Sequence, residues 1–283
     1  MAPRTRKPRG AGRPSRFVYV VLVTVLIGSF FPFYWSILIG SGDSYTINDP
    51  NMSWWPGSNF LSNASYVLHS PSVHFWKALG NSVIVSTTVA ASTVALSTLA
   101  GFAFAKLRFK GSGPLLIAVI ATMAVPVQLG VVPLYILMQK YGWTGHLGAV
   151  IVPALVTAFG VFWMTQYLTQ ALPTELIEAA RVDGCSMIRV FWHVALPAAR
   201  PAAAMLGLFT FVTTWNDFLW PFIVLNSQNP TLPMALRLLQ AEKFTDYSLV
   251  LAGVVLATVP LLMLFLFAGK QLIAGIMQGA VKG

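Results

Sequence analysis

The side chains that could carry acid–base, metal or nucleophilic chemistry are few in this sequence and lie far apart. The chain of 283 residues has eight Asp and Glu, four His and a single cysteine, Cys185. One cysteine cannot form an intrachain disulfide or a thiolate metal site. His69 and His74 are close in sequence, but no cysteine accompanies them, so we expect surface histidines and no metal site. A phosphate-binding G-x-x-x-x-G-K-[ST] loop is also missing, since Lys270 lacks the earlier glycine and the hydroxyl.

The polar segment 172–197 has the most informative spacing in the chain. A proline precedes two acidic residues, which suit the positive N-terminus of a helix, and Gly184 can take the left-handed conformation that closes it. A second short helix over about 186–195 is then expected to end before Pro197. A pair of alanines makes one side small, so another surface could approach closely. The segment predicts a compact helix–turn–helix, too polar to enter a membrane, that docks onto another molecule.

The elements around this segment are long apolar runs. The sequence is 56% hydrophobic and 9% charged, against about 25% charged residues in soluble domains, which excludes a typical soluble enzyme. A helix needs about 20 apolar residues to cross a membrane, and the gaps between charged residues provide such stretches. The first is too long for the core of a signal peptide, so we expect it to be retained. We predict an all-α integral membrane protein with six transmembrane helices, over residues 17–39, 82–105, 114–138, 147–169, 202–225 and 248–269.

The distribution of Lys and Arg orients these spans. Of the 18 basic residues, 14 fall in the two terminal segments and in the second-to-third and fourth-to-fifth connections. Cytoplasmic loops collect Lys and Arg, so we expect a multi-pass protein of the cell (inner) membrane with both termini in the cytoplasm. The net charge of +10 then reflects orientation, and no nucleic-acid partner is expected. Residues 1–16 should form a disordered basic tail near anionic lipid, and 270–283 a cytoplasmic C-terminal tail.

The cytoplasmic loop 170–201, between the fourth and fifth spans, carries a recognisable motif. Glu178-Ala179-Ala180, three residues, Gly184, nine residues and Val194-x-Leu196-Pro197 resemble the EAA motif of ABC importer permeases, with Val194 in place of Ile. Other segments are similar to the carbohydrate-uptake branch of these permeases, and to the shorter, second subunit of the maltose type. They are residues 81–82, 105–111, 215–221 and 279–283.

This resemblance implies a transport subunit and not an enzyme. It implies the permease of an ATP-driven, binding-protein-dependent importer that moves a sugar, a di- or oligosaccharide, into the cytoplasm by alternating access. No cofactor is implied in this chain, because ATP and Mg belong to a separate ATPase. The implied partners are a second permease subunit, two copies of a cytoplasmic ATPase, an extracytoplasmic sugar-binding protein and membrane lipid.

The resemblance also assigns roles to individual residues. In this family the EAA loop is the coupling helix, which docks in a cleft of the ATPase. Glu178 matches the acid that pairs with a basic group there, Gly184 the hinge, and Leu196-Pro197 the join to the fifth span. The implied coupling residues are Glu178, Ala179, Ala180, Asp183, Gly184, Leu196 and Pro197.

Two further segments resemble contact regions of maltose-type permeases. Gly279, Lys282 and Gly283 resemble the tail that reaches into the ATPase dimer interface, with a frayed end as the alternative. By position, residues 226–248, with a short helical pattern at 234–244, match the external loop that probes the sugar site of the binding protein.

Asp217 is the one ionisable group inside a predicted span, and such groups mark functional sites. It lies 17 residues beyond Arg200, about 25 Å along a helix, and so in the outer half of its span. With Trp215 and Asn216 it could line the sugar path, because sugars need hydrogen bonds and an aromatic face. Packing between spans through interhelical hydrogen bonds is the alternative.

Two other classes of protein compete with the permease. An ion-coupled secondary sugar carrier would bury several ionisable groups near the midplane and show internal repeats, whereas only Asp217 qualifies here. An intramembrane enzyme would need a Ser with a His, or clustered acids, within the spans. The predicted spans hold no histidine and no second acid, so both classes fit the sequence less well.

Overall fold

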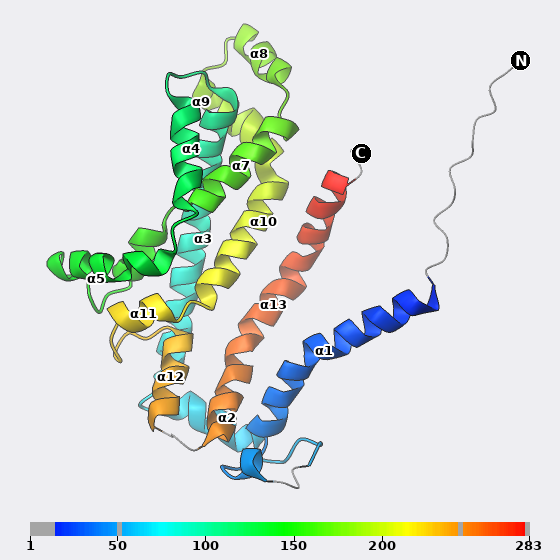
Figure 1. Ribbon diagram of the computed structural model, residues 1–283, viewed down its shortest axis with the longest axis vertical. Coiled ribbons are helices and arrows are strands. Elements are labelled where there is room, and N and C mark those ends of the chain that lie inside the picture. Colours follow the sequence, from blue (N-terminus) through cyan, green and yellow to red (C-terminus); the bar gives the residue numbers. More distant parts are fainter. Residues whose placement is uncertain (1–14, 50–52, 243–245, 281–283) are drawn as a thin grey trace, which may run out of the picture.

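The computed structural model describes residues 15–49, 53–242 and 246–280, without the side chains of Thr46 and of 268–280. Every regular element within these ranges is a helix. Five helices are long and apolar enough to cross a membrane, or up to six if a bent pair of helices forms one span. The molecule is elongated, with α8 and α9 at one end and α2 and α12 at the other (Figure 1). The composition and the helices agree on an all-α membrane protein.

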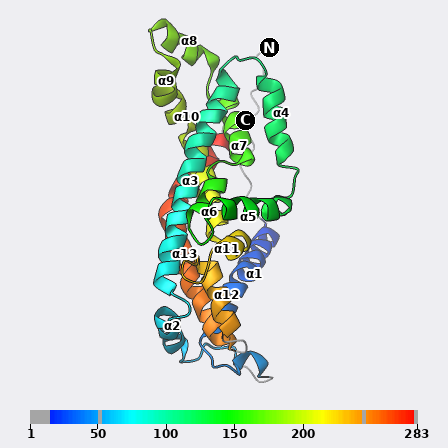
Figure 2. The ribbon, with the colours of Figure 1, turned by 90° about the vertical axis from the view of Figure 1, so that its left-hand side faces the viewer.

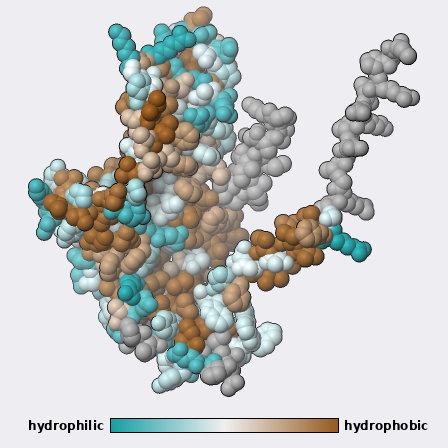
Figure 3. All heavy atoms as spheres, in the orientation of Figure 1, coloured by the Kyte–Doolittle hydropathy of each residue, from teal (hydrophilic) through white to brown (hydrophobic). Residues whose placement is uncertain are grey.

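The first helix, α1 (Arg16–Gly40), projects from the bundle and is joined to it by its C-terminal end (Figure 1). Only its last three residues are buried, and there Gly40 lies against the backbone of α13 (Tyr247–Ala280). A Cβ at Gly40 would lie 2.9 Å from the backbone nitrogen of Ala252, so only glycine allows this approach. Most of the rest of α1 is exposed and apolar (Figure 3), as a lipid-facing helix requires.

Three helices form the centre of the bundle: α3 (Phe75–Lys106), α7 (Ala158–Ala171) and α10 (Leu196–Trp215). The buried side of α3 is rich in small residues, which let helices approach closely in a membrane. At Gly101 the two backbones come so near that a Cβ would lie 2.7 Å from the Cβ of Met164. This close packing provides a rigid frame for the elements on either side.

The segment 114–138, expected as the third span, is sharply bent. It contains α4 (Ser112–Thr122), the 3₁₀ turn η2 (Val127–Gly130) and α5 (Val131–Lys140), with an angle of 89° across the break. Figure 2 shows α4 roughly parallel to α3 and α5 at a steep angle to both. Pro126 stands at the break and disfavours helical conformation in the residue before it. A gap between charges gives the length of an apolar stretch but not its direction, so the sequence did not predict this bend.

The fourth expected span, 147–169, is interrupted near its start. It consists of α6 (Gly148–Ile151), the 3₁₀ turn η3 (Val152–Ala154) and then α7. Thr157 caps α7, because its hydroxyl oxygen accepts a hydrogen bond from the backbone N–H of Gly160 at 3.0 Å. The cap supplies a partner that the first turn of a helix otherwise lacks.

The polar segment between α7 and α10 contains three short elements. They are α8 (Thr174–Val182), α9 (Met187–Val190) and the single π-helical turn η4 (Phe191–Ala195). The expectation that the second of these helices ends before Pro197 is wrong. Residues from Met187 to Trp215 form one continuous helical run that contains Pro197. The π-helical turn η4 lies just before this proline, where a regular α-helix would lose a hydrogen bond.

The segment 202–225, expected as one span, is divided into two helices. Helix α10 ends at Trp215, and the short helix α11 (Leu219–Val224) begins after a three-residue break. Asn216 ends α10, where its side-chain amide donates to the carbonyl of Val212 at 2.8 Å. Asp217 therefore lies in the break and not in the interior of a helix.

The second and sixth expected spans are longer in the structure than in the sequence prediction. Helix α3 begins at Phe75 instead of residue 82, because the charge of Lys77 at its exposed end does not stop a helix. Helix α13 covers the expected span 248–269 and continues to Ala280, through most of the predicted tail.

The end of the molecule opposite α8 contains η1 (Thr46–Asn48), α2 (Phe60–His69) and α12 (Leu232–Glu242). Helix α12 confirms the helical pattern expected near 234–244 as far as Glu242, and the remainder lies outside the described residues. Its start is attached to α3, since the Ser82 hydroxyl accepts the N–H of Leu232 at 2.8 Å.

Candidate functional site

Helix α8 stands at one end of the molecule and is joined to the bundle through one buried side chain (Figure 1). Ile177 is 4% exposed and packs into a cluster with residues of α7, α9 and η4. Glu175 lies in the first turn and Arg181 in the last, so both charges complement the helix dipole. The rest of α8 is largely accessible to another molecule.

The turn after α8 has the hydrogen bonds of a Schellman motif. The N–H of Cys185 donates to the carbonyl of Ala180 at 2.9 Å, and the N–H of Gly184 donates to that of Arg181 at 3.0 Å. Gly184 has φ +79°, the left-handed conformation that this motif requires. Ala180 and Cys185 both pack against the same apolar cluster, which supplies the hydrophobic contact typical of the motif. The angle between α8 and α9 is therefore well defined.

The continuous helix that follows connects this turn with the middle of the molecule. Ser186 caps α9 by accepting the N–H of Arg189 at 3.4 Å. The run from Met187 to Trp215 has 29 residues, about 43 Å at 1.5 Å per residue. The run therefore connects the turn at Gly184 with the residues that follow Trp215.

The structure brings most of the predicted coupling residues to one end of the molecule. Glu178, Ala179, Asp183 and Gly184 are exposed there, and Ala180 is half-buried. Leu196 and Pro197 lie further along, in the first turn of α10. Within the described residues, Glu178 makes no ion pair or side-chain hydrogen bond.

Two apolar side chains of α8 were not singled out from the sequence. Leu176 is 52% exposed and Val182 is 88% exposed. Exposed aliphatic side chains beside an unpaired acid are typical of a surface that becomes buried in a complex. The sequence gives little indication that these two residues are exposed, because apolar residues in a helix usually pack against the rest of their own protein.

Asp217 lines a cavity of about 400 Å³ between α5, η3 and the α10–α11 break. The other polar side chains of its lining are Gln128 and Thr214, with the Trp220 ring beside them. The indole N–H of Trp220 donates to the carbonyl of Ala149 at 3.0 Å, which fixes the ring. An aromatic ring beside an amide, a hydroxyl and a carboxylate offers both kinds of contact that a polar solute needs.

Sequence reasoning missed Gln128, Thr214 and Trp220 as companions of Asp217. Gln128 did carry a signal: it is an amide between Pro126 and Gly130 inside an apolar stretch. Irregular backbone at membrane depth is tolerated only where it is buried in protein or lines a cavity. That combination marks a candidate cavity residue.

Trp215 and Asn216 do not share the cavity of Asp217. Trp215 is 3% exposed and stacks on Phe211, with ring centroids 5.6 Å apart. Both residues lie at a separate cavity of about 180 Å³ against α12 and α13. The structure therefore brings Asp217 together with Gln128 and separates it from its two neighbours in sequence.

The C-terminal residues cannot be placed in the same way. Gly279 lies in the last turn of α13, where side chains are not described, and Lys282 and Gly283 lie outside the described residues. Within the described part of the chain, no group of three or more His, Cys, Asp or Glu could hold a metal ion.

Comparison with known proteins agrees with this architecture. Residues 94–274 match the family model described as "Binding-protein-dependent transport system inner membrane component". The arabinooligosaccharides transport system permease protein AraQ of Halalkalibacterium halodurans is 35% identical over 229 residues, 81% of each chain. The lactose transport system permease protein LacG of Rhizobium radiobacter is 30% identical over 272 residues, 95% of this chain and 97% of the relative.

A solved structure shows the same fold. It is a chain of a bacterial ABC transporter involved in the import of the acidic polysaccharide alginate, with a TM-score of 0.74, 20% identity and coverage of 92% of this chain and 99% of that chain. The matches extend over the α8–α9 segment, the α10–α11 break and most of α13. The chain belongs to the family of inner membrane components of binding-protein-dependent transport systems.

Proposed function

We propose that this chain is the permease subunit of an ATP-driven importer that moves a sugar, a di- or oligosaccharide, into the cytoplasm. The relatives named above carry oligosaccharide and disaccharide names and cover most of the chain, which supports this class of solute. The Asp217 cavity has the hydrogen-bonding groups and the aromatic ring that a sugar needs. As in the sequence prediction, both termini and α8 face the cytoplasm.

The proposed transporter contains further subunits. A second permease completes the path across the membrane, two copies of an ATPase bind ATP and Mg, and an extracytoplasmic binding protein delivers the sugar. The sequence supports a separate ATPase, because it has no phosphate-binding loop of its own. The free energy of ATP hydrolysis must therefore reach this chain through a protein contact.

Helix α8 is the proposed contact with the ATPase. The observation that carries this assignment is its combination of outward exposure and rigid attachment: Glu178 and Val182 are exposed, while Ile177 and the turn at Gly184 fix the helix to the bundle. A cleft that grips α8 would move the helix from Met187 to Trp215, which is joined to α8 through the turn at Gly184.

The far end of that helix is where the movement would act. Thr214 and Asp217, which line the cavity, stand at the end of α10, and Gln128 faces them from the bent α4–α5 segment. Moving α10 relative to α5 would change the width of the cavity. We propose this as the step that alternates access to the sugar site, with Asp217 and Gln128 binding the solute.

A charge reversal tests the coupling contact. The affinity-tagged chain is co-expressed with the other subunits encoded beside its gene, and the ATPase retained during purification is measured. Losing an interfacial charge pair costs about 2–5 kcal/mol, so Glu178→Arg should reduce retained ATPase at least 30-fold.

A matched reversal supplies the control. Arg237 is exposed on α12, at the opposite end of the molecule, so Arg237→Glu should leave retention unchanged. Unchanged retention in Glu178→Arg would contradict the assignment of α8. Uptake of labelled sugar by vesicles that lack ATP but carry an ion gradient would instead support a secondary carrier.

A further inference from the structure

The Asp217 cavity contains one charged group, and its charge is negative. Asp217 is the one ionisable side chain among the described residues that line the cavity, and no Lys, Arg or His belongs to that lining. Gln128, Thr214 and Trp220 supply the neutral polar atoms. A solute in this cavity therefore meets a carboxylate and no basic group.

The protein does not compensate the charge of this carboxylate. Within the described ranges Asp217 makes no ion pair, and the backbone N–H groups of Leu219 and Trp220 hydrogen-bond to it. Such hydrogen bonds satisfy the oxygen atoms of a carboxylate but leave its net charge in place. The side chain is half-buried, so water screens the charge only in part.

The size of the cavity brings any bound charge close to Asp217. A sphere of about 400 Å³ is about 9 Å across, so a charged group in the cavity lies within about that distance of the carboxylate. Two like charges about 9 Å apart, at an effective dielectric constant of about 20, repel enough to weaken binding about 20-fold. An opposite charge strengthens binding by a similar factor. The cavity therefore distinguishes solutes by the sign of their charge.

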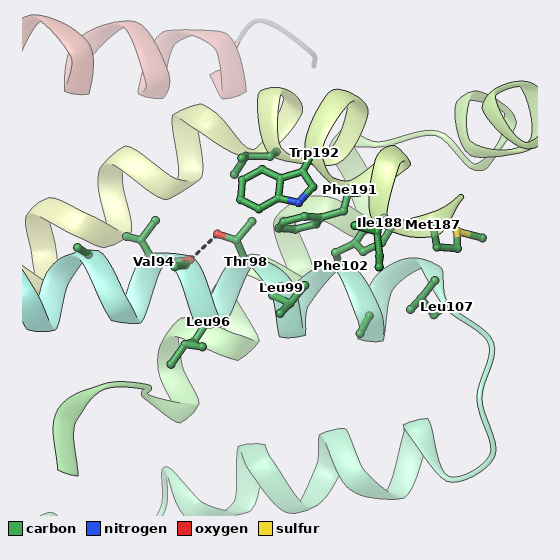
Figure 4. A pocket seen from close by; sticks show the side chains of 14 residues that line it. Val94, Leu96, Thr98, Leu99, Phe102, Leu107, Met187, Ile188, Phe191 and Trp192 are labelled. Carbon is green, nitrogen blue, oxygen red and sulfur yellow. Dashed lines mark hydrogen bonds between the residues drawn. The ribbon is translucent and has the colours of Figure 1, made fainter. Parts of the chain in front are cut away.

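A second hollow, between α3 and the α9–α10 run, is a poor site for a sugar (Figure 4). Its volume is about 580 Å³, and its lining is aliphatic or aromatic apart from Thr98 and the indole N–H of Trp192. The Thr98 hydroxyl donates to the carbonyl of Val94 at 2.6 Å, the bond drawn in Figure 4. A sugar there would lose its hydrogen bonds to water without replacement, which is unfavourable. The carboxylate of Asp217 thus stands in the hollow that suits a sugar.

The fold alone does not decide the charge of the solute. The similar transporter structure described above belongs to a system that imports an acidic polysaccharide. The side chains that line the cavity must decide it, and here they offer an acidic sugar no basic partner.

We propose that Asp217 is a specificity-determining residue that makes the cavity selective against anionic solutes. Neutral sugars and protonated amino sugars enter the cavity, whereas sugars that carry a carboxylate or a phosphate are repelled. Gln128 and Thr214 are neutral and can hydrogen-bond to all of these sugars, so Asp217 sets the sign of the preference. This assignment rests on the proposed function, because it concerns the same cavity.

Cysteine modification measures the effect of charge in the cavity without knowledge of the natural solute. Thr214→Cys, combined with Cys185→Ser, places a thiol in the lining of the purified transporter complex. The complex is treated, with and without ATP, with trimethylammonioethyl methanethiosulfonate, which is cationic, or with sulfonatoethyl methanethiosulfonate, which is anionic. Mass spectrometry of this chain gives the two rates, each divided by the rate with free 2-mercaptoethanol. Both reagents react with the same thiolate, so the ratio of their rates removes any effect of Asp217 on the reactivity of the thiol.

The cation should react faster than the anion, and Asp217→Asn should lower the ratio of the two rates by about 20-fold or more. Asp217→Glu keeps the charge and should keep the ratio. Glu175→Gln removes an equal charge from the exposed first turn of α8 and should leave the ratio unchanged. Leu134→Cys, on the α5 side of the cavity, provides a second thiol that should respond in the same way.

The outcomes separate this proposal from the proposed function. An unchanged ratio in Asp217→Asn would overturn the charge selectivity, as would an equal fall in Glu175→Gln, while the cavity would remain a solute site. Failure of both reagents to modify either thiol, with and without ATP, would mean that no hydrated solute enters the cavity. That result would contradict the proposed sugar site itself.

Discussion

Replacing Gly184 tests the turn that holds α8, because at this residue the effect of backbone strain can be separated from that of a steric clash. Its φ of +79° is unfavourable for any residue with a Cβ, and a Cβ would meet nothing within 4 Å. The cost of Gly184→Ala is therefore conformational, about 1–2 kcal/mol. An energy of this size changes a population ratio about 5- to 30-fold. We expect Gly184→Ala to reduce the ATPase retained on purification, and the uptake of labelled sugar, by factors in this range.

The identity of the new side chain should grade the effect. Asn tolerates the left-handed conformation better than other residues with a Cβ, so Gly184→Asn should reduce ATPase retention and uptake least. Val is β-branched and tolerates this conformation poorly, so Gly184→Val should reduce them most. Gly111 supplies the control, since it has φ +86° and equally open surroundings but precedes α4. Gly111→Ala carries the same strain and should leave ATPase retention unchanged. Equal losses in the two alanine variants, or no loss in Gly184→Ala, would refute the reasoning.

Two further predictions concern the bundle and the cavity. Gly101→Ala places a Cβ 2.7 Å from that of Met164, and the overpacking of about 1–3 kcal/mol should lower the thermal midpoint in detergent by about 2–10 °C. Gly80 lies in the same helix with open surroundings, so Gly80→Ala should not lower the midpoint. Equal midpoints for the two variants would contradict the close packing of α3 on α7. Asp217→Ala removes a charged hydrogen-bonding group worth about 1.5–3 kcal/mol, so it should reduce sugar uptake about 10- to 100-fold and leave ATPase retention intact. Asn216→Ala should change uptake little. A larger loss of uptake in Asn216→Ala than in Asp217→Ala would place the solute in the other cavity.

Local chemistry explains why the α8 segment could be predicted from the sequence. The helix Thr174–Val182, the left-handed Gly184 and a following short helix were all expected. Proline and glycine act on the residues beside them, so their signals do not depend on the rest of the fold. The run through Pro197 was missed because proline usually ends a helix, and the sequence alone does not reveal the π-helical turn η4 that connects α9 with α10.

The Asp217 cavity shows what spacing along the chain cannot predict. Asp217 was singled out as a candidate for the sugar path, with packing between spans as the alternative, because a charge in an apolar stretch is costly. Its partner Gln128 is 89 positions away in sequence, and only the bend between α4 and α5 brings the two to one cavity. Trp215 and Asn216 were grouped with Asp217 as neighbours in sequence, but the end of α10 turns them toward α12 and α13.

The side of the membrane from which α8 is accessible is the most direct test of the proposed coupling. Val182 is 88% exposed on α8 and Trp55 is 81% exposed near the opposite end, so Val182→Cys and Trp55→Cys, each combined with Cys185→Ser, report on the two sides. A membrane-impermeant maleimide should label Trp55→Cys in right-side-out vesicles and Val182→Cys only in inverted vesicles, with added ATPase protecting the latter. Labelling of Val182→Cys in sealed right-side-out vesicles would contradict a cytoplasmic α8 and the coupling built on it.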